Sequence, residues 1–247
     1  MCIQWTKPKI KKESNSSILV TIDKHEKVTK ILVMLVEKVY NFMDLFDRVN
    51  KGYSEAFRKY GNTAAAVQIP KNNQAVRFES VLNFLPESNQ RTLSIADFGC
   101  GLAHLNDYLD TNLEIPFHYT GVEINPDFLE FNKKKNPLSK FLERNEFFSN
   151  NERYDVIISI GTFNIIYAEN ETNHKNFVYS EILKLWEKTD SLLHLNFMST
   201  VVDYSQTGAY HQDLGDLYSF ICHNMSRKLI IDSCYLPYEF SAIVRKG

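Results

Sequence analysis

From Arg91 to the C-terminus, short strand-like runs alternate with stretches of helical pattern. Strands that alternate with helices in this way form a parallel sheet with helices on both faces. The last two runs are separated only by LPY, which is too short for a helix, so they must pair antiparallel. The sequence predicts an α/β fold with a doubly wound, seven-stranded sheet, six strands parallel and one antiparallel. The runs are LSIADF, FHYTGVEI, KFLERNEFF, YDVIISI, LLHLNF, KLIIDSCY and EFSAIVRK.

The residues before this region show helical patterns and no strand-like run. Apolar side chains recur at steps of three and four residues over about 25–60, with a predicted break at Gly52. A second helical segment is expected over 73–84. We expect these helices to form a cap or lid over the sheet. The predicted division is a flexible N-terminal segment (1–24), a helical cap (25–90) and a sheet domain (91–247).

The balance of charges gives no reason to expect an anionic polymer or a membrane as the partner. Of the 247 residues 23% are charged, and the formal net charge is −2 at pH 7. The four cysteines form no C-x-x-C pair, which favours a reducing, cytoplasmic compartment over a disulfide framework or a structural zinc site. The N-terminus lacks the apolar core of a signal peptide, and the run ILVMLV is too short to span a bilayer.

The stretch ADFGCGLAHL, directly after the first predicted strand, has small residues at alternate positions. Gly99 and Gly101 allow the backbone to approach a ligand closely, and the following helix offers free N–H groups. Glu123 ends the next strand about twenty residues later, which is the spacing of an acid that binds ribose hydroxyls. Ligands of doubly wound sheets bind at the carboxyl ends of the strands. The sequence therefore predicts a ligand that carries a nucleoside.

The same loop disfavours a nicotinamide cofactor. The pattern G-x-G-x-x-G requires a glycine where His104 stands. Asp97, just before the glycines, would repel a pyrophosphate and attract an ammonium group. The loop is thus better suited to a nucleoside that carries positive charge.

With these motifs the chain resembles the class I S-adenosylmethionine-dependent methyltransferases over residues 91–247. The glycine-rich loop is similar to the family's first motif, Asp/Glu-x-Gly-x-Gly-x-Gly, with Ala103 in place of the third glycine. YTGVEIN and YDVIISIGTFN resemble its second and fourth motifs. The resemblance implies a Rossmann-like fold, S-adenosylmethionine as cofactor and S-adenosylhomocysteine as product. The cofactor-binding residues it implies are Asp97, Gly99, Cys100, Gly101, Glu123 at the ribose, Ile124 on the adenine, Asn145 or Glu146 near the adenine amino group, and Ser159 and Gly161 at the methionine end.

A finer resemblance rests on NNQAVRF, SIGTFN and YLPYEFSAIVRK. These stretches are similar to small bacterial methyltransferases of surface-polysaccharide and other small-molecule pathways. The likeness implies that Gln74 and Arg77 close over the cofactor, with Arg77 pairing with the methionine carboxylate. The alternative is that Arg77 binds a helix end or a surface carboxylate. The implied acceptor is a small molecule, methylated at a hydroxyl of a sugar or of a phosphorylated precursor.

Candidate acceptor-side residues lie in loops that follow predicted strands. The candidates for catalysis are Asn164, Asp203 and His211. His211 is the candidate base, because a histidine near acidic and aromatic side chains can titrate near neutrality. Asn164 could orient an acceptor by hydrogen bonds. The alternative for His211 is a solvated cluster with Asp213 at a helix start. The residues predicted to contact the substrate are Tyr53, Tyr60, His174 and Tyr204.

Other functions stay in competition with this interpretation. GTFN lacks the Asn/Asp-Pro-Pro-Tyr/Phe motif of enzymes that methylate amino groups of nucleic acids, which argues against DNA as the substrate. Asp203 with Asn164 supplies too few oxygen ligands for magnesium, so no metal is predicted. His194, inside a strand, is expected to be a hydrogen-bonded core residue. The rival functions are methylation of RNA or protein, and a non-catalytic module that binds S-adenosylmethionine.

Overall fold

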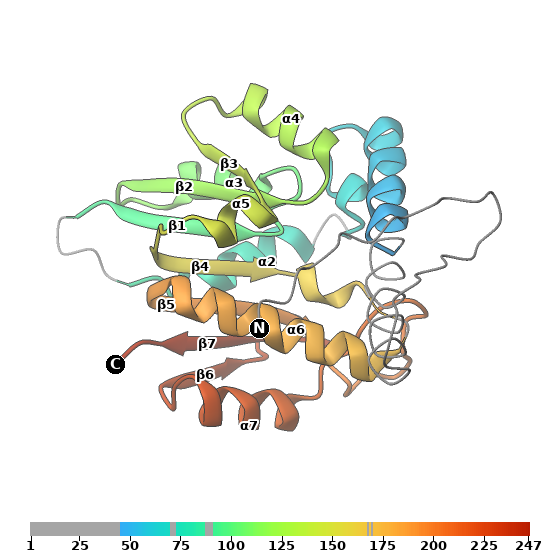
Figure 1. Cartoon of the computed structure of the whole chain (residues 1–247), viewed down its shortest axis with the longest axis vertical. Coiled ribbons are helices and arrows are strands. Elements are labelled where there is room, and N and C mark those ends of the chain that lie inside the picture. Colours follow the sequence, from blue (N-terminus) through green and yellow to red (C-terminus); the bar gives the residue numbers. More distant parts are fainter. Residues whose placement is uncertain (1–44, 70–72, 87–90, 167, 169) are drawn as a thin grey trace, which may run out of the picture.

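Seven strands form one sheet in the order β3-β2-β1-β4-β5-β7-β6 (Figure 1). The computed structural model describes residues 45–69, 73–86, 91–166, 168 and 170–247. The strands are β1 (Leu93–Phe98), β2 (Phe117–Glu123), β3 (Lys140–Glu143), β4 (Tyr154–Ile160), β5 (Thr189–Met198), β6 (Leu229–Asp232) and β7 (Glu239–Arg245). The helices are η1 (Ala64–Val67), α2 (Asn73–Leu82), α3 (His104–Asn112), α4 (Pro126–Lys135), α5 (Arg144–Ser149), η2 (Thr162–Asn164), α6 (Glu171–Lys188) and α7 (Leu214–Asn224).

The strand directions confirm the prediction from the sequence. β1 pairs in parallel with β2 on one side and with β4 on the other, so the winding of the sheet reverses at β1. β7 runs antiparallel to both of its neighbours, β5 and β6. The fold is therefore a Rossmann-like, doubly wound sheet with one antiparallel strand.

Two local predictions were wrong. The run KFLERNEFF is not one strand: β3 ends at Glu143 and α5 begins at Arg144. The helical turn lets Phe147 pack against Phe98 and Tyr154 in the core, where a strand would have carried it along the sheet edge. Gly52 does not break the first helix, since residues 45–60 are helical throughout.

Each face of the sheet is covered by its own helices. On one face, α5, α6 and α7 bury apolar residues such as Phe147, Ile182 and Ile221 in one core cluster. On the other face, α2 and α3 contribute Phe78 and Leu105 to a second cluster. None of the helices in the described part of the chain is both long and apolar enough to cross a membrane.

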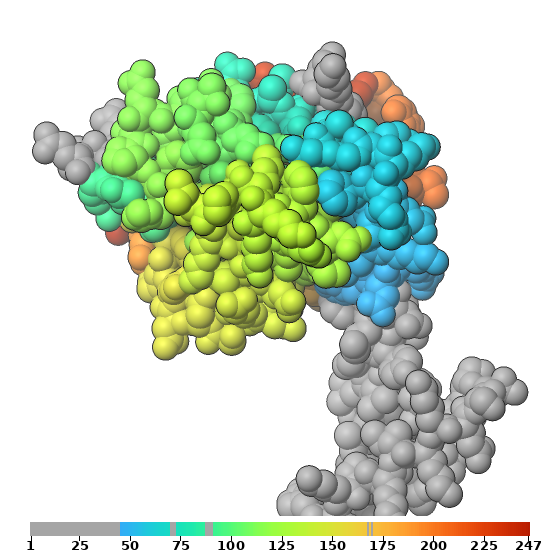
Figure 2. Space-filling model, turned by 90° about the horizontal axis from the view of Figure 1, so that it is seen from above, coloured from blue at the N-terminus to red at the C-terminus, as the bar shows by residue number. Residues whose placement is uncertain are grey.

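The helical residues 45–60 lie at the carboxyl ends of the strands, beside α4 (Figures 1 and 2). Phe57 packs edge-on against Phe128 and Phe131 of α4. The side chain of Asn125, which also caps the N-terminus of α4, donates to the carbonyl of Asn50 and to the Ser54 hydroxyl. These contacts hold the helix over the end of β2. The predicted N-terminal segment (1–24) and residues 25–44 of the predicted cap lie outside the described residues.

His194 sits in the middle of β5 and is 1% exposed. Its register partners Ile158 and Ile243 belong to the apolar cluster on the α2 and α3 face. Neither ring nitrogen has a hydrogen-bond partner among the described residues. It is thus a core residue, but the expectation that it is hydrogen-bonded was wrong. Burial lowers the pKa of His194 to about 4, so the folded protein holds it neutral.

This burial predicts an acid-sensitive fold. Between pH 6.5 and about 4 the unfolded chain binds a proton at His194 and the folded chain does not, so the free energy of unfolding falls as the pH falls. From pH 7 to pH 4.5 the wild type should lose roughly 2 to 3 kcal/mol more than His194→Leu. Urea titrations at a series of pH values would measure the difference between the two proteins.

The matched control is His223→Leu, which changes an exposed histidine of α7 and should keep the wild-type pH dependence. Parallel stability curves for wild type and His194→Leu would refute the assignment.

Candidate functional site

The loop between β1 and α3 is bent by backbone conformations that favour glycine. Gly99 has φ +80° and Gly101 has φ +53°, and Ala103 follows with φ +54°. The amides of Gly99 and Cys100 donate to the Val122 carbonyl, at 2.8 and 3.0 Å, which ties the loop to β2. A Cβ on Gly99 would lie 2.1 Å from Oγ1 of Thr162, so no larger residue fits there. Packing within the protein, before any ligand is considered, therefore already requires glycine at position 99.

Glu123, the last residue of β2, anchors the neighbouring loop. Its Oε1 accepts from the amides of Ile124 and Asn125, at 2.7 and 2.9 Å, and its Oε2 accepts from Gly101 N at 2.9 Å. A carboxylate offers about four lone-pair directions, so Oε2 keeps capacity for one more donor. Burial raises the pKa of Glu123, and the three amides oppose that shift.

Asp97 lies in β1 just before the glycines and is buried. The Tyr119 hydroxyl donates to its Oδ2 at 2.7 Å. Burial raises the pKa of Asp97 to about 7; the Tyr119 hydrogen bond lowers it and the nearby Glu123 raises it further. Two carboxyl groups therefore meet at the ends of β1 and β2, and added positive charge would stabilise both in their ionised form.

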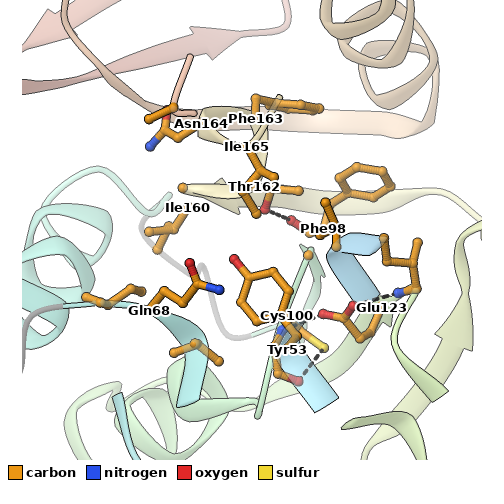
Figure 3. A pocket seen from close by; sticks show the side chains of 18 of the residues that line it. Tyr53, Gln68, Phe98, Cys100, Glu123, Ile160, Thr162, Phe163, Asn164 and Ile165 are labelled. Carbon is orange, nitrogen blue, oxygen red and sulfur yellow. Dashed lines mark hydrogen bonds between the residues drawn. The ribbon is translucent and has the colours of Figure 1, made fainter. Parts of the chain in front are cut away.

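A cavity of about 810 Å³ opens over these loops (Figure 3). Tyr53 and Glu123 lie on one side of it, and Asn164 lies on the opposite side. Tyr53 comes from the helix 45–60, and burial raises the pKa of its hydroxyl, with a smaller contribution from Glu123. The volume is sufficient for a nucleoside-sized ligand together with a second small molecule.

The far end of the cavity holds a buried ion pair. Arg77 of α2 donates through Nε and Nη2 to the two carboxylate oxygens of Glu239, at 2.7 and 2.5 Å. Asn196 of β5 donates to the same carboxylate at 3.0 Å and to the Tyr235 hydroxyl at 2.7 Å. The alternative interpretation of the sequence was that Arg77 binds a helix end or a surface carboxylate. In the structure Arg77 does bind a carboxylate of the chain, but that carboxylate is buried.

Most of the predicted cofactor residues surround this one cavity. The cavity lining includes Gln74, Arg77, Asp97, Gly99, Cys100, Gly101, Glu123, Ile124 and Gly161. Three others lie elsewhere. Asn145 and Glu146 lie on α5 and are not in the lining, which instead includes Arg144. Ser159 is buried within β4 and does not reach the lining.

The predicted acceptor-side residues are divided in the same way. Tyr53, Asn164 and Tyr204 line the cavity. His174 does not: it is fully buried, with Nε2 3.2 Å from the Phe163 carbonyl and its ring against Tyr210. Tyr60 is 44% exposed and lies outside the lining.

The geometry does not support two of the catalytic candidates. His211 lies outside the lining, with Nδ1 2.7 Å from the Ser199 carbonyl and Nε2 accepting from Gln206 N at 3.3 Å. A carbonyl only accepts, so Nδ1 carries the proton and both nitrogens are engaged within the loop. Asp203 is exposed and accepts a hydrogen bond from the Tyr238 hydroxyl at 2.6 Å. Asp213 caps α7, as the alternative interpretation predicted.

Glu239 and Tyr238 also line the cavity, and the sequence patterns did not identify either of them as a site residue. Glu239 begins the run that was interpreted only as a strand, and Tyr238 ends the turn LPY that precedes it. Since β7 is antiparallel, its first residues lie at the same edge as the last residues of β5. The antiparallel pairing was itself the signal that could have placed them at the site.

In the described ranges, no three His, Cys, Asp or Glu side chains are grouped so that they could hold a metal ion.

Comparison with known proteins yields structural matches. No protein-family model matches the sequence, and no curated protein is similar enough in sequence to count as a match. Magnesium protoporphyrin IX methyltransferase from Synechocystis PCC 6803 with bound SAH superposes with a TM-score of 0.62 at 16% identity, over 83% of this chain and 99% of that one. The same enzyme with bound SAM gives 0.58 at 18% identity, over 84% and 97%. The CurJ carbon methyltransferase gives 0.51 at 11% identity, over 94% and 75%.

The chain has the Rossmann-like fold of these methyltransferases. At such low identity the likeness concerns the fold. The chemistry must be argued from this chain's own cavity.

Two Gly→Ala substitutions, one in the glycine loop and one in the helix 45–60, should have opposite effects on the free energy of unfolding. Gly99→Ala places a methyl group against Thr162 at positive φ and should cost about 2 kcal/mol of unfolding free energy or more. Gly52→Ala, in an open helical position, should instead stabilise the protein by about 0.5 to 1 kcal/mol. Chemical denaturation of both variants measures the two effects, and a Gly99→Ala protein as stable as wild type would contradict the geometry.

Proposed function

We propose that this chain is an S-adenosylmethionine-dependent methyltransferase that acts on a small-molecule acceptor. The observation that carries the proposal is the pair of carboxyl groups, Asp97 and Glu123, at the point where the sheet reverses its winding. They face a bare glycine loop in a cavity large enough for a nucleoside and a second molecule.

The lining fits this cofactor in charge and in shape. Glu123 retains one acceptor direction for a ribose hydroxyl and is held in place by three amides. Asp97, ionised by a nearby cation, attracts the ammonium group of the methionine part. When bound, the cofactor would supply a methyl group on a positively charged sulfur. Its transfer to a hydroxyl oxygen would break the sulfur–carbon bond, leave a neutral thioether and release the hydroxyl proton to solvent.

The chain's own contribution to such a transfer is alignment and exclusion of water. Gly161 and Asn164, at the end of β4, lie between the glycine loop and the far end of the cavity. The amide of Asn164 is fixed because its Oδ1 accepts from Met198 N at 2.9 Å. Asn164 can therefore orient an acceptor. His211 is not placed to act as the base, because it lies outside the cavity lining and both of its ring nitrogens are hydrogen-bonded within its own loop.

For the acceptor we propose a hydroxyl of a sugar or of a phosphorylated precursor, as in surface-polysaccharide synthesis. The support is a cavity of limited volume that combines polar groups at its far end with tyrosines near its rim. Methylation of RNA or protein is the second candidate, and it would require an extended basic surface that the net charge of −2 does not favour.

The first prediction from this proposal concerns Glu123. Titration calorimetry should show micromolar binding of S-adenosylmethionine and S-adenosylhomocysteine to wild type. Glu123→Ala should lose roughly 1.5 kcal/mol or more, about tenfold in affinity, because a charged hydrogen-bond acceptor is removed. Glu143→Ala changes an exposed carboxylate at the end of the neighbouring strand and should bind like wild type. If neither compound binds wild type, the proposed function is wrong.

The second prediction concerns pH. With its pKa at about 7, Asp97 is largely protonated at pH 6 and must lose that proton to pair with an ammonium group. Affinity for S-adenosylhomocysteine should therefore rise about tenfold from pH 6 to pH 8 as the ionised fraction grows. Asp97→Asn should bind weakly at both pH values, with most of this rise removed.

Calorimetry at pH 6, 7 and 8 measures this dependence. Asp127→Asn, on the exposed first turn of α4, is the matched control and should follow wild type. An equal pH dependence in wild type and Asp97→Asn would show that another group titrates.

A further inference from the structure

The far end of the cavity, where Arg77 and Glu239 lie, holds opposite charges that neutralise each other. Arg77 and Glu239 are both buried and are joined by two hydrogen bonds. Arg144, another arginine of the lining, is held in the same two-pronged way by Glu181, at 2.6 Å for both bonds. At both places the guanidinium charge is matched by a carboxylate of the chain itself. The end of the cavity that holds Arg77 and Glu239 therefore offers hydrogen bonds without offering net charge.

Two side-chain nitrogens converge on one point of this end, above Gly161. A Cβ built on Gly161 would lie 3.7 Å from Nη1 of Arg77 and 3.8 Å from Nδ2 of Asn164, with no closer atom. Nη1 is the guanidinium nitrogen that the two bonds to Glu239 do not use. Because Gly161 has no side chain, the space between the two donors is open to the cavity.

The sheet order places this point between the two proposed ligands. β4, which ends beside Gly161, is the direct neighbour of β1 and its glycine loop. β7, which begins at Glu239, is three places from β1, or about 14 Å at the usual spacing of strands. A group held above Gly161 is thus adjacent to the glycine loop, with Glu239 on the side away from it.

We propose that Arg77, Asn164 and Glu239 form the acceptor subsite and that it takes an uncharged hydroxyl group of a hexose ring. This inference rests on the proposed function and moves Arg77 and Gly161 from the cofactor to the acceptor. The hydroxyl oxygen accepts from Arg77 Nη1 and Asn164 Nδ2. The Glu239 carboxylate holds Arg77 in place. Its Oε1 accepts only one of the three hydrogen bonds that Arg77 and Asn196 donate, so it keeps acceptor capacity within the subsite.

The charges and the rim of the cavity favour a neutral sugar over other acceptors. At the Arg77–Glu239 end, a phosphate would need a cation that is not already paired, and an ammonium group would need an unpaired carboxylate. Tyr204 and Tyr238, which line the cavity, are 76% and 42% exposed. Their rings offer an apolar surface against which the carbon skeleton of a ring can lie.

The first experiment separates an acceptor role of Arg77 from a cofactor role. S-adenosylhomocysteine and 5′-methylthioadenosine, which lacks the amino-acid part, are titrated into wild type and Arg77→Lys. We expect both affinities in the variant to stay within twofold of wild type. A tenfold loss for S-adenosylhomocysteine alone would assign Arg77 to the methionine carboxylate and overturn the inference, although the proposed function would stand. Failure of wild type to bind either compound would overturn both.

The second experiment tests the hydroxyl subsite with defined probes. Saturation-transfer NMR is recorded with methyl glucoside, methyl galactoside, glucose 6-phosphate and glucosamine, on protein saturated with S-adenosylhomocysteine. We expect a neutral methyl hexoside to bind wild type more tightly than either charged sugar. Binding should fall at least fivefold in Glu239→Gln, and in Gly161→Ala, whose methyl group fills the space between the two donors.

Glu143→Gln, at an exposed position outside the cavity lining, serves as the control and should bind the probes like wild type. Thermal unfolding of every variant checks that it is folded. Tighter binding of a charged sugar, no binding of either methyl hexoside, or equal binding by folded Gly161→Ala would each overturn the inference.

Discussion

The hydrogen bonds of the Glu123 carboxylate are the constraint on which the site depends. One carboxylate oxygen binds the two amides that follow β2, and the other binds the Gly101 amide in the loop after β1. The two loops are therefore fixed relative to each other by the Glu123 side chain at the carboxyl end of β2. Since Gly99 and Cys100 also donate to Val122, this coupling continues through the backbone. Loss of the carboxylate would release both walls of the cavity together.

At the carboxyl ends of the strands, one buried carboxylate is paired with a cation and another has no cationic partner. Arg77 and Glu239 satisfy each other, which limits the cost of removing both from water. Asp97 has only a tyrosine hydroxyl as its side-chain partner, so its carboxyl group stays protonated up to about pH 7. A carboxyl group in a cavity with no cationic partner is a candidate for ligand binding, because a cationic ligand can supply the positive charge that the protein lacks there.

The topology was predictable because it follows from local patterns. Alternating runs indicate βαβ units, and the three-residue gap LPY leaves only an antiparallel pairing. The loop residues Gly99 and Gly101 and the acid Glu123 were found by spacing for the same reason. Arg144 to Ser149 was missed because a short apolar run fits both a strand and a helix, and only the packing of Phe147 decides between them.

The far end of the cavity could not be predicted in this way, because its residues are distant in sequence and meet only in the folded sheet. Arg77 and Glu239 are 162 positions apart. The loop histidine His211 had the right chemistry for a base, yet its own loop uses both ring nitrogens. Chemical type identifies candidates, whereas the available lone pairs and donors depend on contacts that no local pattern contains.

The two ends of the cavity should therefore respond differently to pH. At the glycine loop, binding of a cation is coupled to loss of a proton from Asp97, so affinity changes through neutrality. At the far end, the charge of Glu239 is balanced by Arg77, and a neutral hydroxyl brings no charge to be compensated. If both ligands occupy one cavity, the pH dependence of ligand binding should therefore arise mainly at the cofactor end.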